Sequence, residues 1–285
     1  MRKISARAIT EAIYQAIRKI SFEPDPDVTR LLKEAQNNES SPLARDALSI
    51  ILENHRLSPT LQIPLCQDTG STILFAEIGI EACLAEPLSH SLNRAIIRAQ
   101  QEIPLRASIV QDPLFPRVNT GDNSPGIVHI TQVEGDGLRL TIGQKGGGAE
   151  NTSFLKMFTP AAGANDIVEY ITAKVLAAHS RPCPPLILGI GIGGNFETAP
   201  LLAKRALFEK LGRTHPDPQY RALEEQITEG INAAGCGVQG LGGNHTVLAT
   251  HILSEPCHIA SLPVAVNVQC HAHRHITVEV SRETN

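Results

Sequence analysis

Three cysteines lie at boundaries between sequence segments of different composition, next to residues that restrict the backbone or carry charge. Cys66 precedes a Gln-Asp-Thr-Gly run, Cys183 lies between prolines, and Cys270 ends an apolar run and opens a tail rich in His and Arg. Thiolates are ligands for zinc and iron, so each of the three is a candidate metal ligand. The intervals between them follow no ligand spacing, and spacing alone does not place them in one site.

The other cysteines, Cys83, Cys236 and Cys257, are expected to be small buried side chains. The six cysteines are scattered over 285 residues without a CxxC pair, which excludes a zinc ribbon and a thioredoxin-like redox motif. Disulfide-stapled secreted domains are denser in cysteine, so we expect reduced thiols. A metal site would therefore draw its ligands from distant segments.

Two glycine-rich segments could bind an anion. Gly189, Gly191 and Gly194 match the G-x-G-x-x-G pattern after an apolar strand, but the acidic position about 20 residues later falls near Glu209, inside a predicted helix, which disfavours a dinucleotide site. In Lys145-Gly-Gly-Gly the Lys precedes the glycines, so the segment is not a P-loop. It could instead form a nest of backbone N–H groups for a small anion such as a carboxylate.

The tail after Cys270 leaves two interpretations open. His271, His273 and His275 alternate, so an extended segment would place three imidazoles on one side, where they could bind zinc together with Cys270. The same residues could equally be a solvated strand end.

Composition limits the classes of function. Lys and Arg total 25 and Asp and Glu total 29, a net charge of −4, which provides no electrostatic footprint for nucleic acid or an anionic membrane. Aromatic residues make up 4% and Trp is absent, which disfavours proteins that stack on nucleic-acid bases. No apolar run approaches about 18 residues, so no transmembrane helix is expected. We expect a cytoplasmic protein.

The elements that must position these residues alternate between helix and strand patterns. Helical spacing of apolar residues predicts helices over residues 1–20, 28–36, 42–52, 88–101, 164–180, 198–211 and 218–233. Strands are predicted over residues 71–78, 127–131, 138–142, 184–190, 246–251 and 259–268. Residues 127–131 and 138–142 are expected to form a hairpin, and residues 111–126 a long ordered loop. These patterns predict an α/β (α+β) fold with mixed sheets flanked by helices.

Taken together, the motifs resemble the alpha-type subunit of the class I, iron–sulfur fumarate hydratases and L(+)-tartrate dehydratases. The resemblance runs essentially end to end. It rests on residues 64–70, 106–110 with 112–114 and 119–123, 145–151, 183–185, 189–194 and 258–270. It implies one alpha-type catalytic domain over residues 1–285, with two lobes around a cluster site.

The resemblance also implies a [4Fe–4S] cluster held by Cys66, Cys183 and Cys270, whose fourth iron is left for the substrate. By the same resemblance, Asp68 and His258 are expected to be catalytic. Gln67 and Arg106 are expected to bind substrate, Arg106 through a carboxylate, and Gly147 to present its backbone amide to a substrate oxygen. Read without the family, Asp68 would be a turn residue, Arg106 a surface cation and His258 a core imidazole.

In this family a second module completes the site. The chain ends at Asn285, soon after the Cys270 motif, so we expect an alpha subunit that pairs with a separate beta subunit, in an α₂β₂ heterotetramer. The expected reaction is the reversible hydration of fumarate to L-malate. The alternatives are an L(+)-tartrate dehydratase alpha subunit that yields oxaloacetate, and, more remotely, a dinucleotide-binding oxidoreductase.

Overall fold

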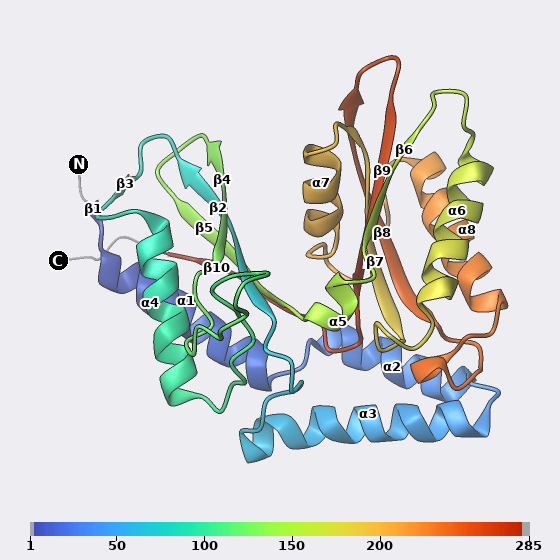
Figure 1. Cartoon of the computed structure of the whole chain (residues 1–285), viewed down its shortest axis with the longest axis horizontal. Coiled ribbons are helices and arrows are strands. Elements are labelled where there is room, and N and C mark those ends of the chain that lie inside the picture. The colour runs from blue at the N-terminus through green and yellow to red at the C-terminus, as the bar shows by residue number, and fades with distance from the viewer. Residues whose placement is uncertain (1–2, 281–285) are drawn as a thin grey trace. The chain divides into compact units, whose positions relative to one another are not determined.

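The structure is a computed structural model that describes residues 3–280. The chain forms two compact units (Figure 1). Unit 1 comprises Met1–Asp25, His55–Gly147 and Arg274–Asn285, and unit 2 comprises Pro26–Asn54 and Gly148–His273. Among the described residues, no helix has the length and apolar character needed to cross a bilayer.

Unit 1 is built on a four-stranded mixed sheet with strand order β10-β5-β2-β4. Two helices pack against it, and a short parallel pair, β1 with β3, lies apart from the main sheet. The elements of unit 1 are β1 (Lys3–Ile4), α1 (Ala6–Phe22), β2 (Ser71–Gly79), β3 (Cys83–Leu84), α4 (Leu88–Glu102), β4 (Ile127–Val133), β5 (Leu138–Lys145) and β10 (Arg274–Glu279).

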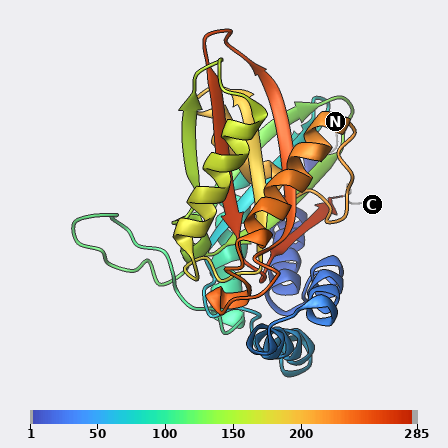
Figure 2. The same ribbon diagram turned by 90° about the vertical axis from the view of Figure 1, so that its right-hand side faces the viewer.

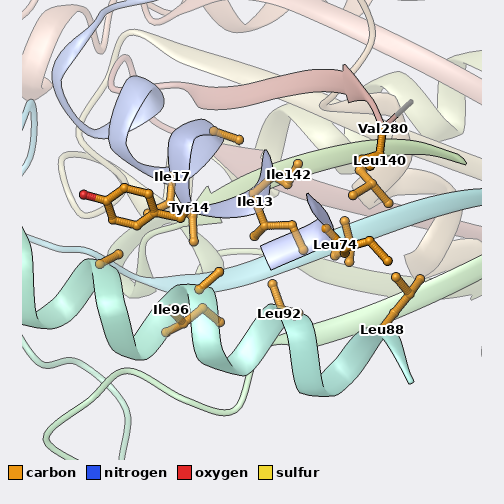
Figure 3. Packing of buried hydrophobic residues seen from close by; sticks show 14 of the residues in the cluster. Ile13, Tyr14, Ile17, Leu74, Leu88, Leu92, Ile96, Leu140, Ile142 and Val280 are labelled. Atoms are coloured by element: carbon orange, nitrogen blue, oxygen red, sulfur yellow. The ribbon is translucent and has the colours of Figure 1, made fainter. Parts of the chain in front are cut away.

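The core of unit 1 forms where α1 and α4 meet the sheet. Ser5 caps α1, since its side chain accepts a hydrogen bond from the amide of Ala8 at 3.1 Å. The apolar face predicted from the sequence is buried, with Ile9, Ile13 and Ile17 at most 1% exposed. These side chains pack with α4 and with strand residues such as Leu140 (Figure 3).

The predicted hairpin of β4 and β5 is wrong. Both strands exist, but each pairs with β2: β4 runs parallel to it on one edge and β5 antiparallel on the other. The connecting turn crosses the end of β2, where the amide of Gly79 donates to the carbonyl of Gly137 at 2.9 Å. A Gly-Asp-Gly turn signal predicts a reversal of the chain, but it does not reveal that an earlier strand lies between the two arms.

Unit 2 is a second mixed sheet with strand order β6-β9-β7-β8 and helices on both faces (Figure 1). Strand β7 is central, parallel to β8 and antiparallel to β9. The elements of unit 2 are α2 (Pro26–Asn38), α3 (Pro42–Leu61, which continues into unit 1), α5 (Gly147–Glu150, whose first residue belongs to unit 1), β6 (Phe154–Phe158), α6 (Ala164–Ala178), β7 (Leu186–Gly194), α7 (Thr198–Ala206), α8 (Pro218–Ala233), the 3₁₀ turn η1 (Val238–Gly240), β8 (Val247–Cys257) and β9 (Leu262–Gln269).

The two faces of this sheet differ. Helices α6 and α8 pack on a largely apolar face that includes Leu188, Ile190 and Val266. Helix α7 covers the other face, where small side chains such as Ala199 and Ala203 let it come close to the strands. The mixed sheets flanked by helices confirm the predicted fold class, and the long loop over residues 111–126 is present as predicted (Figure 2).

Candidate functional site

Cys66, Gln67 and Asp68 lie on one loop of unit 1 that runs into β2. The loop is tied down on both sides of Cys66: the amide of Leu65 donates to the carbonyl of Ser21 at 2.8 Å, and the hydroxyl of Thr69 donates to the carbonyl of Arg106 at 2.8 Å. Cys66 is half-buried and Gln67 is exposed. The loop therefore presents both side chains from a fixed backbone.

Gly70 brings this loop against the end of β5. Its φ is +71°, and a Cβ there would lie 2.2 Å from the carbonyl oxygen of Lys145. Only glycine combines this left-handed conformation with so close an approach. The Cys66 loop and the Lys145-Gly-Gly-Gly segment, 75 or more residues apart in the chain, are thereby placed in contact.

The carboxylate of Asp68 occupies the amide nest predicted at the glycines. Its Oδ2 accepts a hydrogen bond from the amide of Gly147 at 2.7 Å, and its Oδ1 accepts one from the amide of Gly70 at 2.9 Å. The anion expected for the nest is thus an internal carboxylate. Two N–H donors fix the direction of Asp68 and leave its other lone pairs available to a proton donor.

Arg106 combines a fixed backbone with an exposed guanidinium. Its carbonyl accepts hydrogen bonds from Thr69 and from the side-chain amide of Asn123, the latter at 2.9 Å. Within residues 3–280 its guanidinium makes no hydrogen bond or ion pair. A positioned, exposed guanidinium on the segment that holds the Asp68 loop is suited to bind a carboxylate in a bidentate manner.

Sequence reasoning missed Arg274. It is 3% exposed at the start of β10, and its Nη2 donates to the backbone carbonyl of Asp68 at 2.7 Å. The tail after Cys270 is therefore not a solvated strand end, because His273 is also 3% exposed. One signal was present: Arg274, Ile276 and Val278 share the period-2 spacing of one strand face, which places the arginine on the same face as the apolar residues.

Cys183 and Cys270 lie at the same end of the unit 2 sheet, where β7 begins and β9 ends. Cys183 precedes β7 by three residues, and Cys270 directly follows β9, whose last residue, Gln269, pairs with Ile187 near the start of β7. Antiparallel pairing thus brings together residues that are 87 positions apart. Neither cysteine forms a disulfide bond, and Cys183 is exposed whereas Cys270 is half-buried.

The backbone around Cys183 is held in a rare conformation. Cys183 has a φ of +56°, which is costly for a residue with a side chain. Gln239 holds the next residue: the carbonyl of Pro184 accepts hydrogen bonds from the backbone amide of Gln239 at 2.9 Å and from its side-chain Nε2 at 2.6 Å. Gln239 thus determines the direction in which the chain leaves Cys183.

A buried carboxylate anchors the loop that carries Gln239. Glu39 is 1% exposed and accepts hydrogen bonds from the amide of Asn244 and the Nδ1 of His245, the latter at 2.9 Å. Burial by itself would raise the pKa of Glu39, but hydrogen bonds from Ser41, His245 and Asn244 outweigh burial and hold that pKa below its ordinary value. The ionised carboxylate therefore fixes the glycine-rich loop at its far end.

His258 lies away from the two cysteines of its own unit. It is exposed in the turn between β8 and β9, at the end of the sheet where β7 finishes, since Gly194 pairs with Cys257. Its Nδ1 accepts a hydrogen bond from the amide of Ala260 at 3.1 Å, which leaves Nε2 to carry the proton of a neutral ring. The side chain is poised to act through Nε2, but at the opposite end of the sheet from Cys183 and Cys270.

The glycines at 189–194 have a packing role. Gly189 and Gly191 lie inside β7 rather than in a loop after it, and a Cβ on either would lie 2.2 Å from a carbonyl oxygen of α7. Their missing side chains let α7 sit directly on the strand. The strand–loop–helix geometry that a dinucleotide fingerprint requires is absent from this described segment.

Two further expectations about cysteine and metal ligands need revision. Cys257 is exposed rather than buried, whereas Cys83 and Cys236 are half-buried, and burial raises the pKa of Cys236. Among residues 3–280, no three or more His, Cys, Asp or Glu side chains are grouped so that they could hold a metal ion, and this includes Cys270 with its neighbouring histidines. Of the three cysteines implied as cluster ligands, Cys66 belongs to unit 1 and the other two to unit 2.

Comparison with known proteins shows the family to which the chain belongs. The model of the fumarate hydratase (Fumerase) family matches residues 10–279. A protein of Methanocaldococcus jannaschii, provisionally named L(+)-tartrate dehydratase subunit alpha, is 36% identical over 93% of this chain and 95% of its own length. L(+)-tartrate dehydratase alpha subunits of Escherichia coli (strain UTI89) and Shigella sonnei are each 31% identical over 95% of this chain and 90% of their own length. The chain therefore belongs to the fumarate hydratase family of hydro-lyases.

Proposed function

We propose that this chain is the alpha subunit of an iron–sulfur hydro-lyase that adds water reversibly to fumarate to give L-malate. The observation that carries the proposal is a set of neighbouring functional groups in unit 1. A thiol (Cys66), a carboxylate held by backbone amides (Asp68) and a free guanidinium (Arg106) share one hydrogen-bonded set of loops. Such a set can bind a diacid and move a proton beside a metal ligand.

The cofactor we propose is a [4Fe–4S] cluster held by Cys66, Cys183 and Cys270. The donor set fits: none of the three forms a disulfide bond, all three lie outside the helices and strands, and thiolates are the usual ligands of iron–sulfur clusters. With only three protein ligands, such a cluster would leave one iron open and would supply a Lewis acid for the substrate hydroxyl and a carboxylate.

The chain's own residues then have distinct tasks. Arg106 binds one carboxylate of the substrate through its exposed guanidinium. Asp68 exchanges a proton with the substrate or its water, in the orientation set by the amides of Gly70 and Gly147. Gln67 contacts a substrate oxygen, and the Nε2 of His258 donates a hydrogen bond to the substrate. The amide of Gly147, expected from the sequence to bind a substrate oxygen, instead donates to Asp68.

The subunit names of the relatives imply a partner. We propose that a separate beta subunit completes the site, in a cytoplasmic α₂β₂ heterotetramer in which the whole of residues 1–285 forms one catalytic module. A beta subunit would supply the additional cations needed to neutralise the second carboxylate of a four-carbon diacid.

A second candidate reaction has its own support. The relatives named above carry the name L(+)-tartrate dehydratase, and their likeness extends over nearly the whole chain. L(+)-Tartrate differs from malate by one hydroxyl group, and its dehydration yields oxaloacetate. We keep this reaction as the alternative activity of the same site.

The test is an anaerobic assay of the chain with its beta subunit, in which malate and L(+)-tartrate are offered separately. We expect iron and sulfide in the purified complex, and fumarate formation from malate followed by its ultraviolet absorbance. Cys66→Ser should lose the iron and the activity. Cys83→Ser is the matched control, because Cys83 is a half-buried thiol of the same unit and should retain both.

The outcomes separate the candidates. Faster turnover of L(+)-tartrate than of malate would select the second reaction. Full activity and unchanged iron content in Cys66→Ser would overturn the proposed cluster.

A further inference from the structure

A buried asparagine interrupts the apolar strand β9. Asn267 is 6% exposed and lies between Val266 and Val268, on a strand that is enclosed by β6 and β7. Its Oδ1 is buried and accepts no hydrogen bond within residues 3–280, which costs free energy that a valine at this position would not cost. A polar side chain kept at such a cost in a core strand indicates a role other than stability.

The Nδ2 of Asn267 holds two residues that lie shortly after the glycine segment. It donates to the carboxylate of Glu150 at 3.1 Å and to the hydroxyl of Ser153 at 3.2 Å. The backbone amide of Val268 donates to the same hydroxyl at 3.1 Å. Both N–H groups of the asparagine are therefore used, and β9 holds the end of the turn α5 at two points.

Helix α7 adds an ion pair to the same carboxylate. The Nζ of Lys204 contacts Oε1 of Glu150, while Asn267 binds Oε2. The side chain of Lys204 is 17% exposed and that of Glu150 is 41% exposed, so water screens the pair only in part. Because both carboxylate oxygens are bound, the side chain of Glu150 connects α5 to β9 and to α7 in one orientation.

The beginning of α5 is the part that meets Asp68. The amide of Gly147 donates to Oδ2 of Asp68 at 2.7 Å. Residues 146–148 are glycines, which have no side chains to restrict them, and a single helical turn is unstable by itself. The segment is held before the glycines by β5, which ends at Lys145, and after them by the contacts of Glu150. The direction of the Gly147 amide therefore depends on those contacts.

We propose that Asn267, Glu150 and Lys204 position the turn α5 for catalysis. Their contacts hold the amide of Gly147 against Oδ2 of Asp68, and we call the three residues the α5 anchor. The inference rests on the proposed function, in which Asp68 exchanges a proton with the substrate. A misplacement of about 1 Å in a reacting group can lower a rate by about 100-fold. The three residues act through Gly147 and are positioning residues.

The test replaces Asn267 by valine in the complex of the chain with its beta subunit. Valine suits a core strand and removes the unpaired oxygen, so the midpoint of thermal unfolding should stay within about 4 °C of the unaltered complex. The kcat for malate, or for L(+)-tartrate if it is the faster substrate, should fall about 10- to 100-fold. The KM should change little, because Arg106 is unaltered. A merely structural asparagine would leave kcat unchanged.

Two controls make this result specific. Thr250→Val removes a polar side chain of the same 6% exposure from β8 of the same sheet, where its hydroxyl is bonded to that of Thr228 at 2.8 Å, and it should retain kcat. Iron content reports on Cys270, which is three residues from Asn267, and it should not change. An unchanged kcat in Asn267→Val, or a loss of kcat in proportion to a loss of iron, would overturn the inference.

Glutamate variants test the carboxylate of the α5 anchor. Glu150→Ala should lower kcat as Asn267→Val does, whereas Glu150→Gln should regain most of that loss, because its amide oxygen still accepts from Asn267. Glu209→Ala is the matched control, since Glu209 forms a partly exposed ion pair with Arg213 at 2.5 Å and should retain kcat. Full activity of Glu150→Ala, or a glutamine variant as slow as the alanine variant, would contradict the α5 anchor.

Hydrogen exchange tests the α5 anchor without turnover. The backbone amides of residues 146–150 should exchange about tenfold faster in Asn267→Val than in the unaltered complex, because the turn loses the hydrogen bond to the charged Glu150. Equal exchange rates would overturn the inference. If the unaltered complex turned over neither malate nor L(+)-tartrate, the proposed function would fail, and the exchange rates would still decide whether Asn267 holds the turn.

Discussion

Replacing Gly191 by alanine tests whether the glycines of β7 serve packing or ligand binding. The added Cβ would lie 2.2 Å from the carbonyl oxygen of Ala199 and 2.7 Å from the amide nitrogen of Ala203. Both neighbours are backbone atoms of α7, so no side chain can rotate away. Ordinary contact begins at 3.4 Å, and α7 would have to move by about 1 Å off the sheet, as in other overpacked cores.

The cost follows from that displacement. Overpacking of a core typically costs about 1–3 kcal/mol, and here it acts on a helix that lies directly on the central strand of unit 2. For a cooperative unit of about 150–250 residues, each 1 kcal/mol lowers the midpoint of thermal unfolding by about 2–4 °C. We therefore expect Gly191→Ala to unfold about 2–12 °C below the unaltered protein.

Thermal unfolding followed by circular dichroism measures this loss. Gly137→Ala is the matched control, because no atom lies within 4 Å of a Cβ built there and its φ is not positive. Titration of the unaltered protein with NAD should show no binding. Equal midpoints for the Gly191 and Gly137 variants, or NAD binding that Gly191→Ala abolishes, would refute the packing argument and restore the dinucleotide interpretation.

Two further predictions concern the support of the site and the response to acid. Gln239→Asn keeps a residue that tolerates positive φ, but it shortens the side chain that donates to the carbonyl of Pro184 at 2.6 Å. The variant should lose about 1 kcal/mol of stability and release iron to a chelator about fivefold faster. Unchanged release would show that Gln239 does not position Cys183. Burial lowers the pKa of His55 to about 4, so unfolding takes up a proton, stability is complete above pH 6.5 and it falls as the pH drops toward 4. Between pH 7 and pH 5 this loss is about 2 kcal/mol in urea unfolding, and a His55→Gln variant with the same pH dependence as the unaltered protein would contradict it.

The sequence by itself predicted the long helices and the strands β2, β4, β5, β7, β8 and β9, but not β6 or β10, and it contained the family motifs. Helical periodicity predicted α1, α4 and α8, because a helix that buries one face carries apolar residues at intervals of three and four positions. Pro218 after Asp217 marked the start of α8, where the aspartate side chain accepts from the amide of Gln219 at 2.8 Å. The sequence predicted that the glycines around Gly147 would offer backbone N–H groups to an anion, and the amide of Gly147 does donate to a carboxylate.

Only the tertiary structure decided which segments meet. Sequence spacing contains no information on strand order, so it could not show that β2 lies between β4 and β5, or that the ligand of the nest is Asp68. The glycines of β7 match a nucleotide motif, yet their function is set by the helix that packs on them. The same holds for His258: Cys270 follows it by twelve positions in sequence, but eight of the residues between them form an extended strand, and a strand separates its ends by its full length.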